Sequence, residues 1–153
     1  MNVEITDRPE LRAASVHHVG PYYRISEAFA RLGEIAGRAG LIGAGTTMLA
    51  TYHDDPGTTP EAELRSDAAV TIAPTAEIPA GLAELVIPAG RYARATHVGP
   101  YTGLGDAWAR LMGEWLPRSG HRFGDGPSYE VYRNTPMTAA PHELKTDLYI
   151  PLG

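Results

Sequence analysis

Apolar residues recur at two spacings along this chain, and each spacing predicts a different kind of element. Short runs in which apolar and polar side chains alternate predict strands at residues 3–6, 11–19, 47–53, 68–73, 82–87, 91–98 and 128–133. Two longer stretches carry apolar side chains every third or fourth residue, which predicts one helix from Tyr22 and another from Tyr101. A Gly-Pro pair precedes each stretch, and proline suits the first turn of a helix.

These two stretches belong to an internal duplication. The sequence His-Val-Gly-Pro-Tyr occurs at residues 18–22 and again at 97–101, a shift of 79 positions. Further along the chain the shift is 80, so that Tyr52 corresponds to Tyr132 and residues 63–67 correspond to 143–147. We therefore predict one domain over residues 1–153, made of two repeats at about 1–73 and 82–152.

Each repeat reads strand, strand, helix, strand, strand. Neighbouring strands are joined by short turns or by one helix, and that helix has to pack on a face of the sheet. This order predicts an α+β fold of duplicated ββαββ units, with a mainly antiparallel sheet and both long helices on one face. Two such units side by side leave a cleft between them, and ligand sites are common at such interfaces.

Composition adds mainly exclusions. The apolar fraction of 43% and the charged fraction of 20% are those of an ordinary globular protein, and the net charge of −5 argues against nucleic acid as a direct partner. There are no cysteines, no apolar run of transmembrane length and no signal peptide, so we expect a cytoplasmic protein without a membrane partner. His17 and His18 have no second cluster at ligand spacing, so no metal or cofactor is predicted.

The strand at 128–133 contains the main candidate for a functional residue. Strand side chains alternate between faces, so Glu130 and Tyr132 share one face while Tyr129, Val131 and Arg133 share the other. A carboxylate is seldom buried unless a partner satisfies it, and the alternative is a solvated sheet face. At the shift of 80 the corresponding residue is Ala50, so only one repeat carries the charge. A requirement of the scaffold would act on both repeats, and this difference favours a functional role for Glu130.

Other aromatic residues have two interpretations each. Trp108 has helical spacing with Leu111, which favours core packing over ligand contact. Tyr22 and Tyr101 open the helices, where they would face the cleft or cap the core. By alternation, Leu148 and Ile150 would lie under the helices, and Tyr149 would line the cleft with Tyr132.

Three of these motifs together resemble the GyrI-like small-molecule-binding domain. They are the repeated His-Val-Gly-Pro-Tyr, the strand Tyr-Glu-Val-Tyr-Arg-Asn-Thr-Pro at 129–136, and the ending Glu-Leu-Lys-Thr-Asp-Leu-Tyr-Ile-Pro-Leu at 143–152. The resemblance covers nearly the whole chain and implies a concave antiparallel sheet with a central ligand groove. It also implies that Glu130 contacts the ligand at the groove floor. The aromatic walls would then be Tyr22, Tyr101, Trp108, Tyr132 and Tyr149.

The resemblance leaves three functions open. The regulators of this superfamily attach the domain to a helix-turn-helix part, which has no counterpart here, so we expect a stand-alone protein. The first hypothesis is a small-molecule binder for amphipathic, planar, often cationic xenobiotics, with Glu130 as the charge partner. The alternative is a detoxifying hydrolase that opens cyclopropane-type electrophiles, with Glu130 as general base and Tyr101 as hydrogen-bond donor. Sequestration of a protein partner such as gyrase is the third.

Overall fold

The computed structural model describes residues 1–153, and they form two compact units. The first unit is Glu10–Pro88, and the second unit combines Met1–Pro9 with Ala89–Gly153. Both units are α+β with antiparallel strands, which confirms the predicted fold class. No helix is long and apolar enough to cross a membrane.

The first unit packs one helix on a four-stranded sheet. The strands are β2 (Leu11–Val19), β3 (Met48–Tyr52), β4 (Arg65–Thr71) and β5 (Ala83–Ile87), in the order β3-β4-β2-β5. Helix α1 (Ser26–Arg38) covers one face, where its buried residues meet alternate residues of β2 and β4. The buried residues of this core are Ala14, Ala28, Leu32, Ala36, Ala68 and Val70.

The second unit repeats this plan. Its strands are β1 (Val3–Arg8), β6 (Gly90–Val98), β7 (Ser128–Tyr132) and β8 (Lys145–Pro151), in the order β1-β6-β8-β7. One continuous helical stretch covers a face; it consists of α2 (Leu104–Arg110), a π-helical segment (Leu111–Trp115) and α3 (Leu116–Ser119). The buried residues of this core are Ala93, Ala95, Ala107, Leu111, Leu148 and Ile150.

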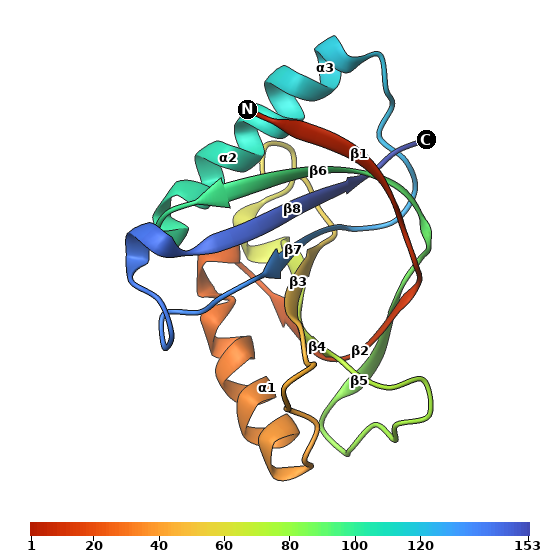
Figure 1. The fold of residues 1–153 in the computed structure, drawn as a ribbon, viewed down its shortest axis with the longest axis vertical. Helices are drawn as coiled ribbons and strands as arrows, with labels where there is room; N and C mark the ends of the chain where they lie inside the picture. The colour runs from red at the N-terminus through yellow and green to blue at the C-terminus, as the bar shows by residue number, and fades with distance from the viewer. The chain divides into compact units, whose positions relative to one another are not determined.

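The compact units differ from the sequence repeats because the first strands are exchanged. β1 pairs with β6 of the second repeat, and β5 pairs with β2 of the first repeat. Figure 1 shows β1, in red, running beside the green β6. Arg8 at the end of β1 donates from Nε to the hydroxyl of Tyr129 at 3.2 Å, and Arg12 on β2 donates from Nε to Glu84 of β5 at 2.8 Å. Arg12 therefore links β2 to its partner β5, and Arg8 links β1 to β7 of the same unit.

The helices predicted from Tyr22 and Tyr101 begin a few residues later, at Ser26 and Leu104, because a short 3-10 turn precedes each of them. Those turns are Tyr22–Arg24 and Tyr101–Gly103, and each follows the Gly-Pro pair. The glycines of these pairs, Gly20 and Gly99, have φ values of 131° and 133°, which a residue with a side chain rarely adopts. The glycine of each Gly-Pro pair is thus required by the backbone at the entry to the helix.

Candidate functional site

Glu130 is the centre of the candidate site. Its side chain lies in β7 and only 3% of the residue is exposed. Trp108 of α2 donates its indole N–H to Glu130 Oε1 at 2.7 Å, and the Tyr132 hydroxyl donates to Oε2 at 2.8 Å. Both of these donors are neutral side chains, and hydrogen bonds to the ionised form of a carboxyl group stabilise that form.

Tyr101 extends this arrangement toward the surface. Its ring meets the ring of Tyr132 edge to face, with centroids 5.6 Å apart, and 38% of the residue is exposed. Burial and the nearby charge of Glu130 both raise the pKa of Tyr101, so its hydroxyl stays protonated at neutral pH. We call Glu130, Trp108, Tyr132 and Tyr101 the glutamate site.

The glutamate site lies on the sheet face that the helix covers. Glu130 is directly opposite Leu148 in the β7–β8 pairing, and Leu148 belongs to the core under α2. Directly opposite residues of paired strands project from the same face of a sheet. Alternation then places Tyr132 beside Glu130, as predicted, and the helix supplies Trp108 from above.

The repeat offset gives each residue of the glutamate site a counterpart in the first unit. Tyr22 and Tyr52 correspond to Tyr101 and Tyr132, and they also pair edge to face, with ring centroids 4.8 Å apart. Trp108 and Glu130 differ from their counterparts, which are Phe29 and Ala50.

Two of these four positions have therefore changed together. The repeat with a carboxylate also has an indole N–H to donate to it, whereas the repeat with alanine has a phenyl ring. Sequence reasoning missed this second difference, although the shift of 79 that relates Trp108 to Phe29 could have revealed it. The carboxylate of Glu130 in the second unit is therefore accompanied by a specific hydrogen-bond donor, the indole N–H of Trp108.

The hydroxyl of Tyr22 is bound to the backbone. It donates to the carbonyl of Asp54 at 2.9 Å and accepts from the amide of the same residue at 3.0 Å. Burial raises the pKa of Tyr22. Tyr22 therefore fixes the segment after β3 through its hydroxyl, and it contacts Tyr52 through its ring.

Tyr149 is not where the sequence analysis expected it. Leu148 and Ile150 do lie under the helix, as predicted, which directs Tyr149 to the opposite face. There Tyr149 is 2% exposed and stacks on Tyr129, with ring centroids 4.7 Å apart and planes at 15°. The guanidinium of Arg8 lies 4.6 Å from the centroid of the Tyr149 ring. The register of β7 on β8 thus separates Tyr149 from Tyr132, and alternation within one strand could not reveal that register.

Comparison with known proteins identifies the family. The model of the GyrI-like small molecule binding domain matches residues 1–152. The chain belongs to this family. A DNA gyrase inhibitor of Erwinia billingiae (strain Eb661) is 33% identical over 160 residues, which cover 100% of this chain and 98% of the relative.

Solved structures share the fold at low sequence identity. The C-terminal domain of EcmrR has a TM-score of 0.84 and 20% identity, and the match covers 99% of this GyrI-like chain and 97% of that domain. The structure of SAV2435 bound to tetraphenylphosphonium has a TM-score of 0.72 and 13% identity, with 100% and 94% covered.

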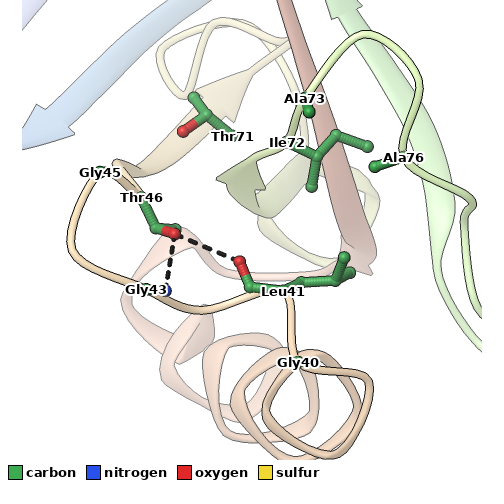
Figure 2. A pocket seen from close by; sticks show the side chains of 9 residues that line it. All are labelled: Gly40, Leu41, Gly43, Gly45, Thr46, Thr71, Ile72, Ala73 and Ala76. Carbon is green, nitrogen blue, oxygen red and sulfur yellow. Dashed lines mark hydrogen bonds between the residues drawn. The ribbon is translucent and has the colours of Figure 1, made fainter.

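One cavity of this GyrI-like chain is separate in its lining from the glutamate site. It has a volume of about 530 Å³ and belongs to the first unit, between the loop after α1 and the segment after β4. Figure 2 shows that glycines, Leu41 and Ile72 contribute much of the wall, and that Thr46 bonds within its own loop. Thr46 Oγ1 accepts from the amide of Gly43 at 2.9 Å and donates to the carbonyl of Leu41 at 3.2 Å. No charged side chain lines this cavity.

The indole donor can be tested with a substitution that the other repeat suggests. Trp108→Phe copies Phe29 and removes the N–H that binds Glu130, so we expect a loss of about 1.5–3 kcal/mol in the free energy of unfolding. Urea unfolding at pH 7 measures it. Trp115→Phe is the matched control, because Trp115 stacks on His121 instead, with ring centroids 6.0 Å apart. Equal losses in the two variants would show that the hydrogen bond to Glu130 contributes nothing beyond the size of the ring.

Proposed function

We propose that this GyrI-like domain binds amphipathic molecules that combine flat aromatic surface with a positive charge, and that Glu130 is the charge partner. The observation that supports this is a buried carboxylate surrounded by aromatic side chains. Two of the groups that donate to it, Trp108 and Tyr132, are themselves uncharged. A ligand cation beside this group adds a Coulomb attraction that neutral donors do not supply.

The aromatic members of the site add a second attraction. A cation over the face of a tyrosine or tryptophan ring gains roughly 0.5–2 kcal/mol, depending on how far it is removed from water. Stacking and charge are less directional than hydrogen bonds to a substrate. A site built on them therefore accepts ligands of varied shape, provided that each has aromatic surface and a positive charge.

Entry to the site requires a side chain to move, because Glu130 is almost fully covered. Tyr132 covers Oε2 and Trp108 covers Oε1. Tyr101 is the most exposed of the four residues and pairs with Tyr132. We infer that the two tyrosines shift together when a ligand enters, whereas Trp108 stays packed against the core under α2.

A titration tests the proposed function directly. Tetraphenylphosphonium, which is the ligand in the SAV2435 structure, is a suitable cationic probe, and a neutral tetraphenyl compound of similar shape, with carbon or silicon in place of phosphorus, is the comparison. We expect the cation to bind more tightly, and the binding of both to quench or shift the fluorescence of Trp108. Equal affinity for the two compounds would contradict the role of charge.

Hydrolysis is the alternative use of the same residues, and the contacts of Glu130 favour binding over it. A general base needs a carboxylate oxygen that can take a proton from water. Here each oxygen already accepts a hydrogen bond from a side chain, at 2.7 and 2.8 Å. Incubation with a cyclopropane-bearing electrophile, followed by mass spectrometry for one added water, distinguishes hydrolysis from binding. Product that disappears in Glu130→Gln would assign the site to catalysis.

Action on DNA gyrase is a second candidate, which the 33% identity over the whole chain to a DNA gyrase inhibitor favours. A supercoiling assay with purified gyrase and relaxed plasmid tests it. We expect Glu130→Gln to inhibit as well as the unaltered chain if the contact is a protein surface, since Glu130 is buried. Absence of inhibition at any ratio of the two proteins would remove gyrase as a direct partner.

A further inference from the structure

A buried carboxylate in the first unit is held by two histidines. Asp67 of β4 is 6% exposed and lies on the sheet face away from α1. His17 of β2 contacts Asp67 Oδ1 through Nδ1 at 2.8 Å, and His53 contacts Oδ2 through Nε2 at 2.5 Å. The hydroxyl of Thr51 donates to Oδ2 at 2.7 Å. These groups are not arranged as a metal site.

The second unit holds the equivalent carboxylate in a different way. Asp147 corresponds to Asp67 at the shift of 80, and it accepts from Arg133 Nε at 2.7 Å and from Thr96 Oγ1 at 2.7 Å. By the repeat offsets, Arg133 stands at the position of His53 and Thr96 at the position of His17. The same structural carboxylate therefore has an arginine in one unit and two histidines in the other.

This difference matters because the two cations behave differently with pH. A guanidinium is charged at every pH at which proteins fold, whereas imidazole ordinarily gains and loses its proton between about pH 5 and 8. Burial alone raises the pKa of Asp67, but hydrogen bonds from His53, His17 and Thr51 outweigh it and lower that pKa to about 2. Asp67 therefore stays ionised over the whole range in which imidazole titrates.

The cluster holds the end of β3 that carries Tyr52. Thr51 and His53 flank Tyr52 in the sequence, and both bind Asp67. The amide of His53 also donates to the carbonyl of Arg65, at 3.1 Å. Asp54 follows His53 in the sequence, and it pairs with Arg65 of β4 at 2.8 Å.

We propose that His17, Asp67 and His53 form a pH-responsive clamp that holds β3 against β4 more tightly in acid than at neutral pH. Protonation of either imidazole places a positive charge beside a buried carboxylate. That charge favours the closed ladder over a locally open one, in which Asp67 and the histidines are hydrated. Because Tyr52 pairs with Tyr22, the clamp also fixes one of the two tyrosine pairs described above.

Amide hydrogen exchange between pH 5 and pH 8 tests the clamp, after correction for the intrinsic effect of pH on exchange. We expect protection of the β3 and β4 amides to fall by roughly threefold to tenfold as the pH rises, because a neutral imidazole lacks the charge that attracts it to the carboxylate of Asp67. The β7 and β8 amides are an internal control, because Arg133 keeps its charge. Equal pH dependence in the two ladders would overturn the proposal.

The chain itself supplies the variants. His17→Thr with His53→Arg copies the contacts of Asp147 into the first unit, and we expect the pH dependence of the β3–β4 protection to disappear. Arg133→His is the reverse change, and it should give the β7–β8 ladder a pH dependence that it lacks. If the double variant does not fold, Arg133→His decides alone. A β3–β4 dependence that survives in the double variant, or an unchanged β7–β8 ladder in Arg133→His, would contradict the clamp.

Discussion

Glu130→Gln is expected to weaken the binding of tetraphenylphosphonium by about 2–5 kcal/mol, the usual effect of removing one charge from a desolvated pair. The physical reason is the position of the carboxylate, which is 3% exposed among aromatic rings. In such a place water screens the attraction to a cation poorly. Isothermal titration at pH 7, with the unaltered chain and the variant side by side, measures the difference.

Glutamine is the appropriate replacement because it keeps the shape and the hydrogen bonds. Its carbonyl oxygen can accept from Trp108 as Oε1 does, and its amide can donate to the hydroxyl oxygen of Tyr132. The variant should therefore fold with little change in stability. Glu130→Ala would be harder to interpret, because the indole N–H would lose its acceptor and a cavity would open.

The neutral tetraphenyl compound provides the control for this experiment. Its affinity should change little in Glu130→Gln, because stacking on the aromatic rings does not depend on the charge. A similar loss for both compounds would mean that the substitution has disturbed the pocket in general. No loss for either would exclude Glu130 as the charge partner and would leave the tyrosines as the main source of affinity.

Leu111→Ala is expected to lower the free energy of unfolding by about 2–5 kcal/mol. Leu111 is completely buried, and it begins the π-helical segment that covers the core of the second unit. The substitution removes most of a side chain from a close-packed interior, and neighbouring atoms refill the space only in part. Chemical denaturation followed by circular dichroism measures the loss.

Leu32→Ala is the matched change in the first unit. Leu32 is also completely buried, and it corresponds to Leu111 at the shift of 79. We expect a loss of similar size, with amides of α1, β2 and β4 losing more protection from hydrogen exchange than those of the second unit. Met112→Ala tests the pattern at an exposed position, where 37% of the residue is accessible, and should cost much less.

Much of the architecture could be predicted from local patterns. Alternation located the strands, helical spacing located α1 and the stretch from Leu104 to Ser119, and the repeated Gly-Pro marked where each helix is entered. The repeat offset also singled out Glu130, because a duplicated scaffold shows where its two copies differ. These features depend on residues close together in the sequence or on comparison of the chain with itself, so they can be predicted from the sequence alone.

Strand partners and register are the features that only the tertiary structure decided. β1 joins β6 rather than the sheet of its own repeat, and its Arg8 donates to Tyr129 of β7, which is 121 positions away in the sequence. The register that sets Glu130 opposite Leu148 placed the carboxylate under α2 and sent Tyr149 to the other face. The physical reason is that alternation fixes which residues of a strand share a face, whereas the face turned toward the helix depends on pairing with a distant strand.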